Sequence, residues 1–247
     1  MTTAQQPAPA PRVWREPAGI APRGTLVLLA GRGESAAIYQ RFGTRLAADA
    51  YRVVAVPATT GHAEAAAADA LATALADQET PRPLVLVGVD TGAPRALRLA
   101  RRHAGAVDGV VLAGLPTRAP AEPAAGTEEE ALAARTACPN HRLVLSREMA
   151  LAGPADAERP PADTTPLGLP LLALHGGADR ISPPAEALPR YRELGATSVV
   201  TVRDGRHDIL NDVTHRSVAA TLVLFLERLR LGAELPPLVE DATRADA

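Results

Sequence analysis

Lysine is missing from this chain, because all 26 basic residues are arginine. Enzymes that form a Schiff base with their substrate, or that hold pyridoxal phosphate on a lysine, are therefore excluded. The phosphate-binding P-loop also needs a lysine, as do dehydrogenases that use a catalytic one. Any catalysis has to rely on carboxylate, histidine, arginine or hydroxyl groups.

Cysteine is almost as scarce. Cys138 is the only one, which excludes an internal disulfide and a cysteine-based zinc site. His141 follows it at the spacing C-x-x-H, but a metal ion needs further ligands, so we expect a packing role for Cys138. No metal or organic cofactor is expected, and the single thiol is compatible with a reducing, cytoplasmic compartment.

Long apolar runs and one-sided charge are also absent. No run is long enough to span a bilayer. Residues 1–12 are rich in Pro, Ala and Gln and lack the features of a signal peptide, so we expect a disordered N-terminal segment. The formal net charge is −2 with interspersed signs, which argues against nucleic acid or an anionic membrane as partner. A small-molecule substrate is the expected partner, and the oligomeric state stays open.

Strand and helix patterns alternate along most of the chain. β-Branched or apolar runs predict strands at 13–16, 26–30, 51–56, 84–88, 109–114, 169–175 and 198–203. Apolar residues at helical spacing predict helices at 35–49, 63–77, 91–103, 184–194 and 214–231. Runs without polar alternation are typical of strands covered on both faces. The sequence therefore predicts an α/β fold with a mostly parallel central sheet and helices on both faces.

One segment interrupts the alternation. Residues 116–168 are rich in Pro and Ala and offer two helices, at 131–137 and 141–151. We interpret this segment as a small inserted lid. The core then comprises 13–115 and 169–232, and 233–247 form a C-terminal tail.

The strand at 84–88 passes into the next helix through Gly88-Val89-Asp90-Thr91-Gly92. This has the form of the nucleophile elbow G-x-S-x-G, whose flanking glycines leave room for a tight turn. Aspartate replaces the usual serine. Asp90 is thus a candidate nucleophile, and the alternative is that it only caps the following helix.

Two further residues follow Asp90 in a meaningful order. Asp179 comes after the strand that ends at His175, and His207 lies just after the last predicted strand. Because the carboxyl ends of parallel strands share one edge of a sheet, the three side chains can meet there. The alternatives are a turn role for Asp179 and a surface position for His207, held by Asp208. His175 is interpreted as structural.

The order of nucleophile, acid and histidine resembles that of the α/β-hydrolase superfamily, over nearly the whole stretch 24–231. The turn at 30–34, Ala-Gly-Arg-Gly-Glu, is similar to the His-Gly-x-Gly region of lipase-like members. The resemblance implies a catalytic triad of Asp90, His207 and Asp179. It also implies an oxyanion hole made by the backbone N–H groups of Arg32 and Thr91.

The aspartate at the elbow resembles the epoxide hydrolase and haloalkane dehalogenase branches. Their carboxylate attacks a saturated carbon to give an alkyl-enzyme ester, which water activated by histidine then hydrolyses. A carboxylate is already charged at neutral pH and needs no base to act as nucleophile. Its attack on an ordinary ester would give a high-energy anhydride, so the esterase mechanism is disfavoured. Flanked by Asp90 and Asp179, His207 is expected to be biased toward its charged form until Asp90 is esterified.

Neither branch is matched completely. Thr91 stands where the dehalogenases place a halide-binding tryptophan, and Trp14 lies near the N-terminus. The three tyrosines, Tyr39, Tyr51 and Tyr191, fall outside the predicted lid, where epoxide hydrolases place their proton donors. The proton would have to come from His141, Arg135 or Arg142.

Residues 31–36 also match the dinucleotide fingerprint G-x-G-x-x-A after a strand. No acidic residue follows the second strand to hold a ribose, which disfavours nucleotide binding. The sequence therefore predicts a cofactor-independent hydrolase with an Asp nucleophile. The alternatives are the same fold with Asp90 as general base in a cyclisation or elimination, and a non-catalytic small-molecule binding protein.

Overall fold

The computed structural model describes residues 10–58, 62–118, 127–152 and 160–239. Residues 1–9 and 240–247, which hold most of the expected N-terminal segment and part of the expected tail, lie outside it. Near both ends of the described chain the structure adds detail to the predicted bounds. Arg12 already pairs with Ala55 in the sheet, so the first strand begins before residue 13. Leu235 is buried, and Arg228 donates to its carbonyl oxygen, so the expected tail begins as packed chain.

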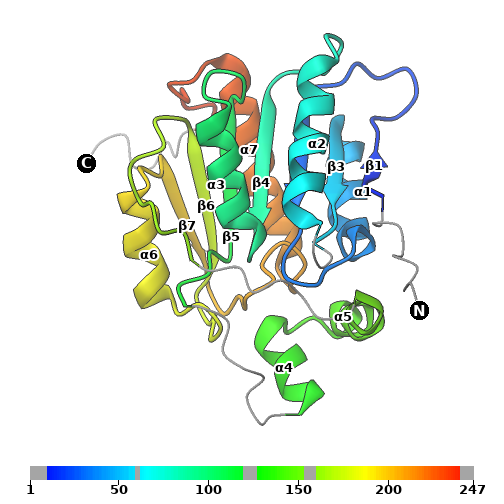
Figure 1. The fold of residues 1–247 in the computed structure, drawn as a ribbon, viewed down its shortest axis with the longest axis vertical. Helices are drawn as coiled ribbons and strands as arrows, with labels where there is room; N and C mark the ends of the chain where they lie inside the picture. Colours follow the sequence, from blue (N-terminus) through cyan, green and yellow to red (C-terminus); the bar gives the residue numbers. More distant parts are fainter. Residues whose placement is uncertain (1–9, 59–61, 119–126, 153–159, 240–247) are drawn as a thin grey trace, which may run out of the picture.

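Seven strands form one sheet in the order β1-β3-β2-β4-β5-β6-β7 (Figure 1). Their bounds are β1 Arg12–Trp14, β2 Gly24–Leu29, β3 Tyr51–Val56, β4 Leu84–Val89, β5 Gly109–Ala113, β6 Leu171–Gly176 and β7 Ser198–Val202. β1 runs antiparallel to β3, and every other neighbouring pair is parallel. The predicted mostly parallel sheet is confirmed.

Helices cover both faces of the sheet (Figure 1). The short 3₁₀ helix η1, Ala36–Tyr39, leads into α1, Gln40–Ala48, which shares one face with α7, His215–Leu231. The other face carries α2 Ala63–Ala76, α3 Gly92–Arg102 and α6 Pro184–Glu193. The parallel sheet is thus buried between two helical layers, which explains why its central strands are apolar throughout.

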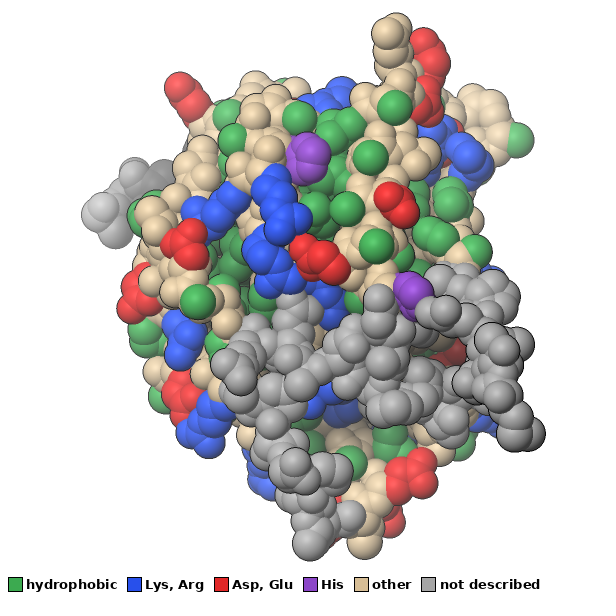
Figure 2. Space-filling model, in the orientation of Figure 1, with side chains coloured by type: hydrophobic (Ala, Val, Ile, Leu, Met, Phe, Trp, Pro, Cys, Tyr) green, Lys and Arg blue, Asp and Glu red, His purple; other side chains and the backbone are tan. Residues whose placement is uncertain are grey.

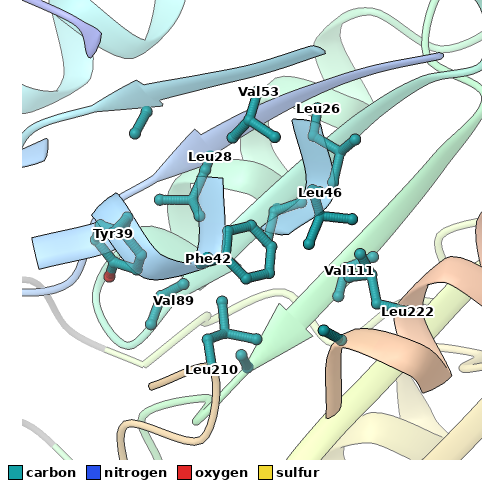
Figure 3. Close-up of a cluster of buried hydrophobic side chains, with 14 of the residues drawn as sticks. Leu26, Leu28, Tyr39, Phe42, Leu46, Val53, Val89, Val111, Leu210 and Leu222 are labelled. Atoms are coloured by element: carbon teal, nitrogen blue, oxygen red, sulfur yellow. The ribbon is translucent and has the colours of Figure 1, made fainter. Parts of the chain in front are cut away.

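Alternate residues of the strands feed two separate cores. Leu26 and Leu28 of β2 face α1, whereas the intervening Val27 faces the opposite layer. Figure 3 shows Phe42 of α1 among Leu28 and its neighbours in the first core. Burying a side chain of this size stabilises the fold by about 1.5–3 kcal/mol, so these contacts anchor α1 on the strands that position the site.

Two helices are inserted between β5 and β6, at the end of the sheet where the parallel strands terminate (Figure 1). They are α4, Glu128–Arg135, and α5, Pro139–Ala152. Both begin earlier than predicted, and for α4 the cause is a capping box between Thr127 and Glu130 that fixes its first turn. The predicted lid, 116–168, also includes residues 119–126 and 153–159, which lie outside the described part of the chain.

The surface is mixed in charge. On the face seen in Figure 2, basic and acidic side chains lie next to one another among apolar ones. Within the described residues, no helix is both long and apolar enough to cross a membrane.

Candidate active site

Asp90 sits on a strained turn between β4 and α3. Its φ is +46°, a region that non-glycine residues rarely adopt. The turn is held by two backbone hydrogen bonds: the Asp90 N–H donates to the Ala113 oxygen at 3.0 Å, and the Ala93 N–H donates to the Asp90 oxygen at 2.9 Å. Strain of this kind persists only where the surrounding structure enforces it, and it is concentrated at functional sites.

The glycines on either side of Asp90 have no room for a side chain. A Cβ on Gly88 would lie 2.5 Å from the Ala93 Cα, and one on Gly92 would lie 2.1 Å from the backbone oxygen of Leu29. Both obstacles are backbone atoms, which cannot rotate away. The spacing of the two glycines therefore follows from how closely the turn packs on β2 and α3.

The three candidate catalytic side chains meet. His207 Nδ1 lies 2.8 Å from Asp179 Oδ2, and His207 Nε2 lies 3.4 Å from Asp90 Oδ1. The other oxygen of Asp179 accepts the backbone N–H groups of Ile181 and Ser182 at 2.8 and 2.9 Å. This fixed carboxylate orients the imidazole, whose second nitrogen points at Asp90.

This geometry excludes two of the alternatives that the sequence left open. Thr91, not Asp90, is the N-cap residue of α3, and no side-chain hydrogen bond caps that helix. The capping interpretation of Asp90 was therefore wrong. His207 is 1% exposed and bound to Asp179, so the interpretation as a surface histidine held by Asp208 was wrong as well.

Two backbone N–H groups flank the Asp90 carboxylate. The Arg32 N–H donates to Asp90 Oδ2 at 3.2 Å. The Thr91 N–H has no acceptor among the described residues, and Thr91 is fully buried. These are the two groups expected to form an oxyanion hole. Asp90 Oδ1 is left as the oxygen that receives no backbone hydrogen bond.

Electrostatics couple the three side chains. Burial lowers the pKa of His207, but its hydrogen bonds with Asp179 and Asp90 outweigh this and raise it to about 10. Burial raises the pKa of Asp90, yet the hydrogen bond and charge of His207, followed by the charge of Arg135, bring it well below the usual range. At neutral pH the unliganded site is thus an imidazolium between two carboxylates.

His175 helps to hold the loop that carries Asp179 and Ser182. The Leu115 N–H donates to the Tyr191 hydroxyl at 2.9 Å, and this hydroxyl lies 3.0 Å from His175 Nδ1. His175 Nε2 lies 2.8 Å from the Ser182 carbonyl oxygen, to which it can donate. Burial lowers the pKa of His175, so the ring is neutral and structural, as its position at the end of β6 predicts.

Sequence reasoning missed a second charged cluster over Asp90. The Arg135 guanidinium, at the end of α4, contacts Glu34 and lies 2.8 Å from Asp208 Oδ1. Its Nη1 lies 3.9 Å from Asp90 Oδ2. The His141 ring adds a contact of 3.2 Å to Asp208. No motif signals Glu34 or Asp208, because their partner Arg135 lies 101 and 73 residues away along the chain.

Of the three proton donors considered from the sequence, only Arg135 faces Asp90. His141 is turned toward Asp208, and Arg142 donates to the Thr136 carbonyl oxygen. Burial lowers the pKa of Arg135, but Asp208 and Glu34 raise it far more, so the guanidinium keeps its charge. It can stabilise negative charge as a hydrogen-bond donor rather than by releasing a proton.

The candidate site is closed. Asp90 is 3% exposed, His207 1% and Asp179 4%. Arg135 covers Asp90 from the side of α4. A cavity of about 670 Å³ lies elsewhere, between η1, α1, α5 and the start of α7. We place the candidate chemistry at the strained, charged cluster rather than at this hollow.

A metal centre is not formed by the part of the chain that the structure describes, where no three His, Cys, Asp or Glu side chains gather suitably. No protein-family model matches the sequence, and no curated protein matches it.

Solved structures, in contrast, match well in shape. A monoglyceride lipase from Saccharomyces cerevisiae superposes with a TM-score of 0.70 at 17% identity, covering 89% of this chain and 91% of the lipase. An esterase from Exiguobacterium antarcticum (TM-score 0.63, 17% identity) and a bromoperoxidase from Bacillus anthracis (0.62, 18%) each match over 84% of this chain and 93% of their own. The chain therefore has the α/β-hydrolase fold, and these identities establish the fold alone.

Proposed function

We propose that this protein is a hydrolase that opens a bond at a saturated, electrophilic carbon of a small organic substrate, with Asp90 as nucleophile. One observation carries the proposal. Asp90 stands at the strained elbow with one carboxylate oxygen on the Arg32 N–H and the other facing His207 Nε2 at 3.4 Å. Epoxides and alkyl halides are the two substrate classes that suit this nucleophile.

The first step forms an ester. Asp90 Oδ1 donates an electron pair to the substrate carbon, and the bond from that carbon to its leaving oxygen or halogen breaks, with the electrons going to the leaving atom. The low pKa of Asp90 keeps the attacking group charged at any ordinary pH. Nη1 of Arg135 lies 3.9 Å from Asp90 Oδ2, and this charged donor stabilises the negative leaving group.

The second step hydrolyses the ester and regenerates the Asp90 carboxylate. Esterification removes one of the two negative charges beside His207, so its pKa falls from about 10 and the imidazolium loses its proton, to the alkoxide of an opened epoxide or to water when the leaving group is a halide. The neutral ring can then accept a proton, which it later passes to the departing alkoxide. It takes that proton from water, whose oxygen attacks the Asp90 carboxyl carbon. The oxyanion forms beside the N–H groups of Arg32 and Thr91, and its collapse releases the alcohol and restores Asp90 with one oxygen from water.

The similar lipase and esterase structures point to ester chemistry on this fold, but the elbow residue argues for a different substrate. A carboxylate that attacks an ester carbonyl would form an anhydride, which is higher in energy than the ester. Asp90 as a general base is also disfavoured, because a group whose pKa is this low holds protons weakly.

The test is isotopic. The protein is incubated in ¹⁸O-water with a panel of terminal epoxides and primary alkyl halides, under single-turnover conditions, and the peptide containing Asp90 is analysed by mass spectrometry. We expect one heavy oxygen in Asp90 and none in the first product. Asp90→Asn should abolish turnover, and His207→Gln should trap the alkyl ester.

A matched control is Asp204→Asn, which alters an exposed aspartate on the same loop as His207. Its positive φ of +57° suits asparagine, so this variant should turn over normally. Heavy oxygen in the product instead of Asp90 would contradict the covalent mechanism and favour a general-base role.

The burial of Asp90 favours one second candidate, a non-catalytic protein in which Asp90, His207 and Arg135 form a closed structural network. In that case neither an adduct nor labelled Asp90 forms with any substrate of the panel. Substituting Asp90 would then lower the stability of the protein and change no chemistry.

A further inference from the structure

A hollow on the described surface lies away from Asp90, between two helices of the core and one of the insertion. It has a volume of about 670 Å³ and is lined by η1, α1, α5, residues 210–211 and the start of α7. This volume lies within the roughly 300–1,000 Å³ typical of sites for small molecules. None of the three triad residues lines it, so its occupant is a separate question from the substrate of Asp90.

The floor of this groove is apolar. Phe42 and Leu210, which Figure 3 shows in the core cluster, line it together with Ile38 and the half-exposed Val144. Phe42, Leu210 and Ile38 are each 3% exposed, so the apolar side chain that the groove leaves open to water is Val144, at 37%. The occupant therefore needs an apolar portion.

The rim of the groove is basic. Arg41 and Arg45 of α1 and Arg216 of α7 line it, and no aspartate or glutamate does so among the described residues. Three acids act on lining residues without being part of the lining: Asp49 contacts Arg45 at 3.5 Å, Asp208 contacts the His141 ring at 3.2 Å, and the charge of Asp212 acts on His215. The occupant therefore needs a negative charge as well.

The pKa of His215 responds to the same arginine charges. Burial lowers its pKa first, and the charges of Arg41, Arg216 and Arg45 lower it further, against the opposing charge of Asp212 on the preceding loop. These are the charged groups that face this ring from α1, α7 and the loop before it, and α5 contributes Asn140 and the His141 ring to the groove.

We propose that the groove binds a single-chain amphiphile with a carboxylate head, a medium-chain fatty-acid anion. Arginine matches a carboxylate with two parallel hydrogen bonds, and a single negative charge costs less to desolvate in a half-buried groove than the double charge of a phosphate. The head lies at the rim beside Arg45 and Arg216, and the tail lies along the groove against Val144.

The test uses the full chain and sodium decanoate below its micelle concentration. Histidine resonances are followed by NMR over a pH titration, with and without decanoate. We expect the pKa of His215 to rise on binding, because the carboxylate offsets the charges of the neighbouring arginines. No change at His215 would overturn the proposal.

Affinity measurements with related ligands test the charged head and the apolar tail separately. Decanoate should bind more tightly than decyltrimethylammonium or acetate, and its binding should weaken as salt is added. Equal affinity for the cationic amphiphile would show that the groove selects apolar chains without regard to charge, and tighter binding of decyl phosphate would show that the head is wrongly assigned. Either result overturns the proposal.

Substitutions at the rim provide the matched variants. Arg45→Gln with Arg216→Gln changes two exposed side chains, so the fold should be kept, and decanoate affinity should fall by about three- to tenfold. Arg192→Gln alters an exposed arginine of α6 outside the groove and should leave the affinity unchanged. Equal affinities of the double variant and the control would also overturn the proposal.

Discussion

Arg135 offers the sharpest test of the charged cluster above Asp90. Its side chain is 11% exposed and lies between Glu34, at 1%, and Asp208, at 4%. Replacing it by methionine keeps most of the side-chain volume and leaves two buried carboxylates without their counter-charge. Breaking a buried ion pair from one side costs about 3–5 kcal/mol, so we expect Arg135→Met to lose on that order of unfolding free energy.

Urea unfolding followed by far-ultraviolet circular dichroism, together with the fluorescence of Trp14, measures this loss. The matched control is Arg118→Met, which breaks an ion pair with Glu186 on the surface. Solvent screens that pair, and we expect no measurable loss. If the two variants lose equal unfolding free energy, Arg135 does not act as the stabilising counter-charge of the buried Glu34 and Asp208.

The loss should also depend on pH. Burial already raises the pKa of Glu34 against the charge of Arg135, whereas that charge helps to hold the pKa of Asp208 below its usual value. Without Arg135 both pKa values rise, and the native state then binds more protons than the unfolded state. Stability of the variant therefore falls as pH rises, and the penalty should be larger at pH 8 than at pH 5. Adding Glu34→Gln to Arg135→Met removes one uncompensated charge and should recover part of the loss. A penalty that shrinks with rising pH would contradict this explanation.

Two further predictions concern the elbow and its histidine. Gly92→Ala places a Cβ 2.1 Å from the Leu29 oxygen and should cost about 3 kcal/mol or more, whereas Gly105→Ala, which has open space at φ +84°, should cost about 1–2 kcal/mol in urea unfolding. Equal losses of unfolding free energy in the two variants would mean that the turn at Asp90 shifts to accommodate the added Cβ. The raised pKa of His207 contributes stability that is fully present below its unfolded value of about 6.5 and is lost as pH rises toward about 10. The unfolding free energy should therefore decline over this range by up to about 5 kcal/mol more in the wild type than in His207→Gln, and parallel pH profiles would contradict the shift.

Much of the fold follows from local patterns. The apolar runs at β2, β4 and β5 are buried on both faces, which is the reason that they lack polar alternation. Periodicity placed the core helices to within a few residues. The capping box that starts α4 was visible in the sequence at Thr127 and Glu130, and neglecting it shifted the predicted helix.

The candidate triad was also within reach of the sequence. Asp90, Asp179 and His207 each follow a predicted strand, and parallel strands present their carboxyl ends at one edge. Chain direction therefore brings the three together before any packing detail is known. The two glycines of the elbow carry the same information, since a turn that tight needs them.

Only the tertiary structure decided what lies above Asp90. The position of α4 depends on side chains that meet across long separations, such as Arg135 with Glu34 and Asp208, and no periodicity or motif encodes such contacts. The closed site and the basic groove beside α1 have the same origin. Local sequence sets which segments become strands, turns and helices, whereas the free energy of burying charges and apolar surface together decides which of their side chains meet.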